Sequence, residues 1–213
     1  LIGGSNSDRL DGGAGVDTAD YSTAGSGVTV DLVDGDGSGS DAGGDTLVGI
    51  ENVIGSAFAD ALYGSSGANS LSGGGGSDYI SAGDGNDTLT GYGGNDTLLG
   101  GTNDDYLDGG AGTDRYVWQA GQGNDTIADA GTTLAEMDVL VLENVSSSLV
   151  GLSRANGSTT LSVNVSALRD ADVLDRERAA GRLRGPLHGI PIALKDNIHT
   201  TDMPTTGGAV AFE

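Results

Sequence analysis

The chain of 213 residues carries a net charge of −22 and contains no cysteine. Because so acidic a protein repels phosphate groups and anionic lipids, we expect neither nucleic acid nor a membrane surface as a partner, and the lack of cysteine excludes disulfides and thiolate metal sites. Aromatic residues make up only 4% of the chain while 40 residues are glycine, so a large apolar core cannot offset the entropic cost of folding. Multivalent cations are therefore expected to contribute to stability. No apolar run reaches the roughly 18 residues of a membrane span.

The first 54 residues divide into a repeat block and a spacer. Residues 3–20 hold two nine-residue units, GGSNSDRLD and GGAGVDTAD, and we assign residues 1–20 to this first block. Residues 21–54 break the period and form an inter-block spacer, with a predicted strand at VTVDL and a return segment, GDTLVGIENVI. Within the spacer, the run from Asp34 to Ser38 is similar to the start of an EF-hand loop. The twelfth position of such a loop would be Asp45 instead of Glu, so a solvated loop is predicted.

Residues 55–128 form the main repeat block. Seven nine-residue units run without a gap from residue 55 to residue 117, and an eighth occupies residues 120–128 after the insertion Trp118-Gln119. The eighth residue of each of the seven units is apolar, namely Leu62, Leu71, Ile80, Leu89, Leu98, Leu107 and Tyr116. The triplet around this residue predicts a short strand whose central side chain points into a thin apolar core. Proline is absent from residues 1–165, as a parallel ladder that needs every N–H requires.

The sixth residues and the glycines of the units have the chemistry of a calcium site. Glycine accepts positive φ and lets the backbone approach an ion, and carboxylates and backbone carbonyls are hard oxygen ligands that suit Ca²⁺. The candidate metal residues at the sixth position are Asp8, Asp17, Asp60, Asn69, Asp78, Asp87, Asp96, Asp105, Asp114 and Asp125. The candidate glycines are Gly73, Gly74, Gly76, Gly83, Gly85, Gly91, Gly93, Gly100, Gly101, Gly109, Gly110 and Gly112.

These units resemble the G-G-x-G-x-D-x-U-x nonapeptide of the RTX, or haemolysin-type, calcium-binding proteins, and we assign the resemblance to residues 1–165. It implies an all-β fold, a parallel β-roll in which one coil takes two units and units 18 residues apart stack. The sixth residues then form a first column, Asp60, Asp78, Asp96 and Asp114, and a second column, Asn69, Asp87 and Asp105. Ions that bridge successive turns number about five in the main block. The Asn69–Asp87 site is expected to be the weakest, because asparagine carries no charge.

The resemblance also implies a function and a location. It implies a non-catalytic, secreted, extracellular module of bacterial type, exported unfolded through a type I secretion apparatus and folded on binding Ca²⁺. Extracellular calcium modules bind with dissociation constants of about 10⁻⁴–10⁻³ M, near the calcium level outside cells. One alternative is a disordered Gly/Asp linker, which the in-register apolar residues disfavour. Another is a structural spacer in a surface adhesin, which further repeat blocks would favour.

Residues 129–165 are predicted to close the end of the roll. Alternating apolar residues over 138–165 and the turn signal Asn156-Gly157 predict antiparallel strands. The stretch resembles the β-cap of such rolls, and a cap is needed because an open sheet edge pairs with other chains.

Residues 166–213 differ from the rest of the chain. Residues 1–165 hold 24 acidic and 3 basic residues, whereas residues 166–213 hold 7 and 6, so two unrelated segments meet near Ser166. The runs RGPLHGIPIALKDNI and DMPTTGG resemble the N-terminal part of the amidase signature family, which implies an incomplete α/β fragment. In that family the lysine of the LKDN run, Lys195 here, is the base of a Ser–cis-Ser–Lys triad whose serines lie further along. Because a lone lysine catalyses nothing, we expect this chain to be inactive; the alternative is that the roll is a calcium-dependent appendage of an amidase.

Overall fold

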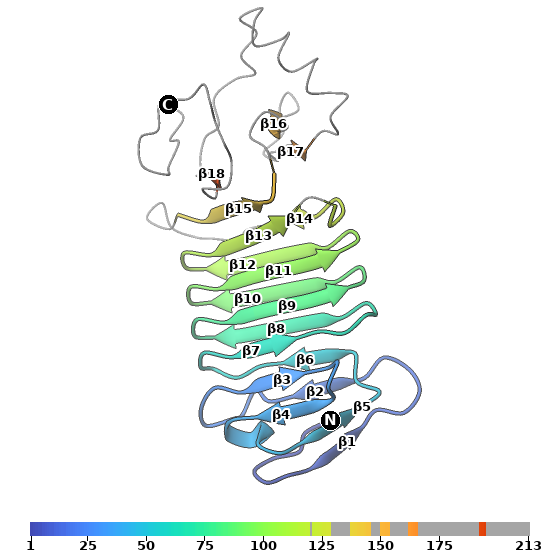
Figure 1. The fold of residues 1–213 in the computed structure, drawn as a ribbon. Helices are drawn as coiled ribbons and strands as arrows, with labels where there is room; N and C mark the ends of the chain where they lie inside the picture. The colour runs from blue at the N-terminus through green and yellow to red at the C-terminus, as the bar shows by residue number, and fades with distance from the viewer. Residues whose placement is uncertain (120, 129–136, 146–149, 154–161, 166–191, 195–213) are drawn as a thin grey trace, which may run out of the picture.

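The computed structural model describes residues 1–119, 121–128, 137–145, 150–153, 162–165 and 192–194. Apart from one short 3-10 helix, η1 (Ser40–Ala42), the regular elements of these residues are strands, and two sheets form a parallel β-roll (Figure 1). The ten-stranded sheet has the spatial order β1 (Arg9–Asp11), β5 (Thr46–Val48), β4 (Asp36–Ser38), β3 (Thr29–Asp31), β7 (Ala61–Tyr63), β9 (Tyr79–Asp84), β11 (Thr97–Thr102), β13 (Arg115–Gln119), β15 (Val139–Glu143) and β18 (Ile192–Leu194). The six-stranded sheet has the order β14 (Thr126–Ile127), β12 (Tyr106–Ala111), β10 (Thr88–Gly93), β8 (Ser70–Gly75), β6 (Asn52–Ile54) and β2 (Thr18–Asp20). The all-β prediction is confirmed.

Each repeat of the main block contributes one strand, and successive strands alternate between the two sheets. In the six-stranded sheet Leu89 lies opposite Leu71 on one side and Leu107 on the other. In the ten-stranded sheet Leu98 lies opposite Ile80 in the same way. Because a turn after each strand reverses the chain, two repeats complete one coil and residues 18 apart become neighbours. The predicted parallel roll with two repeats per coil is therefore present.

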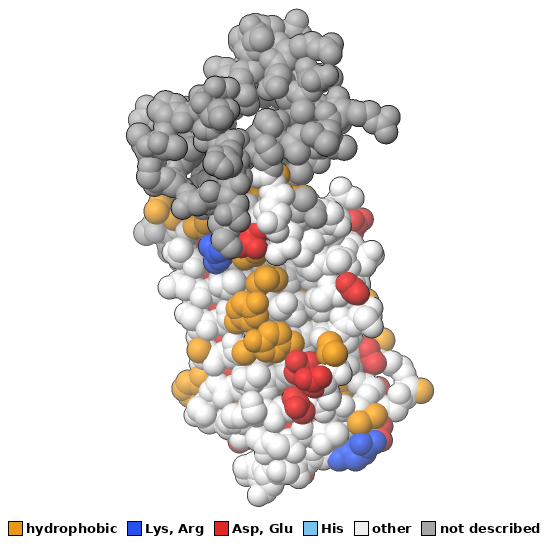
Figure 2. Space-filling model, in the orientation of Figure 1, with side chains coloured by type: hydrophobic (Ala, Val, Ile, Leu, Met, Phe, Trp, Pro, Cys, Tyr) orange, Lys and Arg blue, Asp and Glu red, His pale blue; other side chains and the backbone are white. Residues whose placement is uncertain are grey.

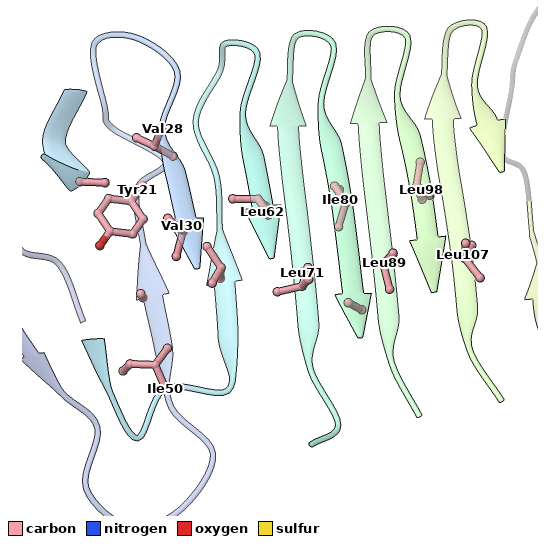
Figure 3. Packing of buried hydrophobic residues seen from close by; sticks show 14 of the residues in the cluster. Tyr21, Val28, Val30, Ile50, Leu62, Leu71, Ile80, Leu89, Leu98 and Leu107 are labelled. Carbon is pink, nitrogen blue, oxygen red and sulfur yellow. The ribbon is translucent and has the colours of Figure 1, made fainter. Parts of the chain in front are cut away.

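The core is a single file of apolar side chains between the sheets. The eighth residues of the seven units are at most 3% exposed, and the six from Leu62 to Leu107 point inward (Figure 3). Their strand neighbours alternate outward, as in the exposed–buried–partly buried start of β10. Figure 2 shows that, despite the charge of −22, most of the visible surface of the roll is uncharged. The sixth-position acids from Asp60 to Asp114 are buried instead.

The spacer joins the two repeat blocks into one roll. The predicted VTVDL strand is present as β3, and the return segment supplies β5 and β6. Strand β6 lies between β2 of the first block and β8 of the main block, so the six-stranded sheet is continuous. The run from Asp34 to Ser38 is not a solvated loop throughout, because its last three residues form β4, which pairs antiparallel with β3. Asp34 and Asp36 are exposed there.

Beyond the main block the ten-stranded sheet continues for two more strands. Strand β15 pairs in parallel with β13 and extends the ten-stranded sheet, and β18 pairs with β15. The antiparallel pairing predicted for residues 138–165 is present only in part: β16 (Val150–Ser153) and β17 (Ser162–Val165) pair antiparallel, whereas β15 pairs in parallel. The Asn156-Gly157 turn, Lys195 and most of residues 166–213 lie outside the described residues. Within the described part of the chain, no helix is long and apolar enough to cross a membrane.

Candidate metal centre

The turns between strands owe their shape to residues with left-handed backbone. From residue 73 onward, the second and fourth positions of each repeat have positive φ, and these residues are Gly74, Gly76, Gly83, Gly85, Tyr92, Gly94, Gly101, Asn103, Gly110, Gly112, Gly121 and Gly123. Gly93, expected among the site residues, lacks this conformation; the neighbouring Gly94 has it, with φ of +132°. In this unit the second position is Tyr92 and the third is Gly93, so the glycines do not show which positions have positive φ. Gly73, Gly91, Gly100 and Gly109 lie at the first position and are buried.

A ladder of carboxylates ties each turn to the one below it. The backbone N–H of Asp78 donates to Oδ1 of Asp96 at 2.8 Å, and the N–H of Asp96 donates to Oδ1 of Asp114 at 2.8 Å. In the second column the N–H of Asp87 donates to Oδ1 of Asp105, also at 2.8 Å. Each partner lies 18 residues away, so the predicted columns exist as stacked side chains.

The second carboxylate oxygen of the central acids has no hydrogen-bond donor. Among the described residues, the buried Oδ2 atoms of Asp78, Asp87, Asp96 and Asp105 are without a partner. A buried charged oxygen left in this way is costly, and native proteins satisfy nearly all such atoms with protein, water or an ion. These four oxygens therefore mark the places where a cation fits.

Backbone carbonyls supply further oxygens at the same places. A Cβ built on Gly91 would touch Oδ2 of Asp96 and lie 2.6 Å from the carbonyl oxygen of Gly109 in the turn above. The carbonyl oxygen of Gly76 lies directly against Gly94, and that of Gly83 against Gly101. Each interval between stacked turns thus offers a carboxylate oxygen together with carbonyl oxygens. This donor set fits Ca²⁺, which takes mixed carboxylate and carbonyl ligands in flexible geometry.

Asp60 and Asn69 do not share this arrangement, although the sequence places them in the same columns. Both oxygens of Asp60 accept hydrogen bonds, Oδ1 from the N–H of Val28 and the hydroxyl of Ser56, and Oδ2 from the N–H of Ser56. Asn69 accepts from the N–H of Ser65 and donates to the carbonyl of Glu51. The turns before them lack left-handed residues. The protein itself therefore satisfies these two side chains.

Three acids that the nine-residue pattern misses occupy sixth-position places. Asp45 accepts the N–H of Asp8 at 2.8 Å, and Glu51 accepts the N–H of Asp17 at 2.8 Å. At the other end, Asp138 accepts the N–H of Asp114 at 2.9 Å. Insertions shift these acids out of period, but each directly precedes a strand triplet, TLV, NVI or VLV. That signal could have identified them.

The remaining expected acids lie at the ends of the columns or outside them. Asp8, Asp17 and Asp125 are partly buried, and Oδ1 of Asp125 accepts the N–H of Asp105 at 3.2 Å. Three further acids of the main block, Asp84, Asp104 and Asp108, lie off the sixth position, where a side chain is expected to face solvent, and Asp84 and Asp104 are exposed. Asp108 is only partly exposed, because its strand β12 is flanked by β10 and β14, and its buried Oδ1 is also without a partner among the described residues.

Burial raises the pKa of five sixth-position acids, Asp78, Asp87, Asp96, Asp105 and Asp125. Desolvation is the main cause, and it raises the pKa of Asp78 to about 7 and that of Asp87, Asp96 and Asp125 to about 6. Stacked like charges add to the effect, such as Asp96 on Asp78. The pKa of Asp105 is raised for the same reason. Without a cation the ionised columns are therefore unfavourable in the folded state.

No three acidic or histidine side chains converge on one point in the described ranges. That result agrees with the geometry of the turns, since each turn supplies one carboxylate and the backbone supplies the rest. A cation site of this kind therefore does not require a cluster of acidic side chains. It is identified instead by the stacking of similar turns, each with one carboxylate and several backbone carbonyls.

Comparison with known families agrees with both parts of the chain. The RTX calcium-binding nonapeptide repeat family matches residues 1–21, 54–89 and 81–116, and the amidase family matches residues 143–213. The chain thus contains RTX calcium-binding repeats followed by a segment of the amidase family. The amidase match begins before Ser166 and includes β16 and β17, which lie in the segment expected to be a cap.

Curated amidases and amidotransferase subunits match this chain only over short stretches. An amidase of Gibberella zeae is 51% identical over 45 residues, covering 21% of this chain and 8% of the relative. One glutamyl-tRNA(Gln) amidotransferase subunit, from Mycolicibacterium gilvum, is 54% identical over 48 residues, covering 22% and 10%. The corresponding subunit of Vitis vinifera is 34% identical over 89 residues, covering 42% and 15%. The chain spans between 8% and 15% of the length of these relatives.

Proposed function

We propose that residues 73–128 bind four calcium ions between stacked turns and that calcium completes the fold of this part of the chain. The four unpartnered buried oxygens of Asp78, Asp87, Asp96 and Asp105 carry the proposal. Each ion lies between the turn that bears one of these acids and the turn above it. This assignment replaces the expected sites at Asp60–Asp78 and Asn69–Asp87, since Asp60 and Asn69 have protein donors. It adds one at Asp105–Asp125.

The proposed setting is outside the cell, in a protein exported by a type I secretion apparatus. Two features support a protein that is unfolded where the calcium concentration is low and folded where it is high. The columns place ionised carboxylates on adjacent turns, which repel without a cation. Calcium at extracellular levels of about 10⁻³ M is sufficient for modules of modest affinity. Metal binding and folding then form one coupled equilibrium.

Two substitutions that remove the same charge test the site assignment. Asp87→Asn removes the charge next to a proposed ion, and Asp84→Asn removes an exposed charge three residues away in the same turn. We expect Asp87→Asn to raise the calcium concentration at the folding midpoint about ten-fold, which corresponds to roughly 1.4 kcal/mol. Asp84→Asn should change it less than about two-fold. Calcium titrations followed by circular dichroism compare the variants. Equal shifts would show that calcium acts only by diffuse screening.

The raised pKa values predict how pH acts on the protein. A carboxyl group whose pKa is higher when folded stabilises the fold only while protonated, so the calcium-free fold should lose stability as pH rises from about 4 to about 7. Calcium must displace these protons, so its affinity should fall several-fold between about pH 7.5 and about pH 5. Circular dichroism in chelator and in calcium measures both trends. A calcium midpoint that does not depend on pH over this range contradicts the assignment of these acids as ligands.

The amidase-family match favours a second function, in which the roll is a calcium-dependent appendage of an amidase. In this proposal Lys195 is the general base, and it acts only with serines supplied by the amidase-family sequence. The test is hydrolysis of simple amides by the protein in calcium and in chelator, with Lys195→Ala as the control. Turnover that Lys195→Ala abolishes and that calcium increases would support it. Turnover at the same rate in calcium and in chelator would contradict the proposal that the roll makes the amidase depend on calcium.

A further inference from the structure

A second ladder runs beside the carboxylate columns, at the fifth position of each repeat. The N–H of Asn95 donates to Oγ of Ser77 at 3.2 Å, and the N–H of Thr113 donates to Oδ1 of Asn95 at 2.8 Å. On the other edge, the N–H of Asp104 donates to Oδ1 of Asn86 at 3.3 Å, and that of Asn124 to Oδ1 of Asp104 at 2.8 Å. The side chains of Ser77, Asn86, Asn95 and Asp104 therefore hold the backbone of the turn above them.

The hydrogen bonds of the two ladders run in opposite directions, so that each of two stacked turns supplies one backbone donor and one side-chain acceptor. A sixth-position carboxylate reaches down to the N–H of the turn below, whereas a fifth-position side chain accepts from the turn above. Thus Ser77 and Asp78 face Asn95 and Asp96 through two reciprocal hydrogen bonds. The same pairing joins residues 95–96 to 113–114, 86–87 to 104–105, and 104–105 to 124–125.

These four reciprocal pairs coincide with the four intervals that hold the unpartnered oxygens. The intervals below them have only the carboxylate bond, because their lower turns carry Ala59 and Ala68 at the fifth position. In these same turns the side chains of Asp60 and Asn69 form hydrogen bonds with other groups of the protein. The reciprocal pair is thus a feature of the ion-binding intervals and not of stacked turns in general.

We propose that Ser77, Asn86, Asn95 and Asp104 are positioning residues of the calcium sites. Each accepts the N–H of the fifth-position residue of the turn above, which is the neighbour of that turn's sixth-position residue, and so sets the separation of the two turns between which an ion binds. Three of the four are neutral acceptors, which join the turns without adding charge to an acidic column. This inference rests on the proposed function of the columns.

Asn95 offers the sharpest test, because the chain contains matched controls for it. Asn95→Ala removes the acceptor for the Thr113 N–H, and Asn95→Ser replaces it with the side chain that serves in the turn below. Thr113 occupies the same position one turn higher, and no hydrogen bond is made by its hydroxyl within the described residues. We expect Asn95→Ala to raise the calcium midpoint about two- to five-fold, as the loss of one exposed hydrogen bond implies. Asn95→Ser and Thr113→Ala should stay near wild type.

Amide exchange in the calcium-saturated protein provides the second readout. The Thr113 amide should exchange faster in Asn95→Ala than in wild type and recover in Asn95→Ser. An unchanged midpoint and unchanged Thr113 exchange in Asn95→Ala would overturn the inference, as would a serine variant that behaves like alanine. If the wild type itself does not respond to calcium, the proposed function fails instead. The Thr113 exchange then still reports on the hydrogen bond alone.

Discussion

Removal of calcium is expected to open residues 73–119 to hydrogen exchange while strands β3 to β7 remain protected. The proposed function makes the upper turns depend on ions, because the Oδ2 atoms of Asp78, Asp87, Asp96 and Asp105 lack protein donors. A site filled at about 100 times its dissociation constant contributes roughly 2.7 kcal/mol, so protection should fall about 100-fold for each site lost. Exchange measured by mass spectrometry in calcium and in chelator maps this difference along the chain.

The base of the roll has other means of support. Eleven buried apolar side chains lie in residues 1–63, against seven in residues 64–119. The buried Asp45 accepts the N–H of Asp8 and, at 3.0 Å, the hydroxyl of Tyr21, so neither of its oxygens needs an ion. Equal loss of protection in β3 to β7 and β9 to β12 would show that the base depends on calcium as well. Equal retention would show that calcium does not fold the roll.

Gly94→Ala is expected to abolish folding at calcium concentrations that fold the wild type. Gly94 has φ of +132°, which side chains rarely adopt, and its Cβ would collide with the backbone carbonyl of Gly76. Overpacking against backbone costs about 1–3 kcal/mol, and the displaced carbonyl belongs to a proposed ion site. The calcium midpoint in circular dichroism should therefore rise by at least about ten-fold.

Gly93→Ala is the matched control in the same turn. A Cβ on Gly93 would meet nothing within 4 Å, and the residue opposite it in the next coil is already Ala111. Its midpoint should stay within about two-fold of wild type. If both variants fail alike, the turn does not tolerate substitution at either position, and the close approach at Gly94 is not the cause.

Much of this architecture follows from a nine-residue period. Apolar residues at the eighth position predicted the buried file from Leu62 to Tyr116, and the 18-residue stacking of Asp78 on Asp96 was implied by the resemblance to RTX rolls, in which one coil takes two repeats. The repeat pattern succeeds here because the strand pairing and the carboxylate ladder join equivalent residues of neighbouring coils. Insertions interrupt the nine-residue period in some places. The pattern therefore did not identify Asp45, Glu51 and Asp138 as members of the columns.

The tertiary structure decided which acids remain open to an ion. Asp60 and Asp96 occupy the same repeat position, yet Asp60 is satisfied by Ser56 and by Val28, a residue 32 positions away in the spacer. Oδ2 of Asp96 has no such donor among the described residues. A repeat pattern identifies which side chains enter a column. Whether a carboxylate there is satisfied depends on the conformation of its own turn, which brings the Ser56 N–H to Oδ2 of Asp60, and on the spacer packed against that turn, which supplies the Val28 N–H.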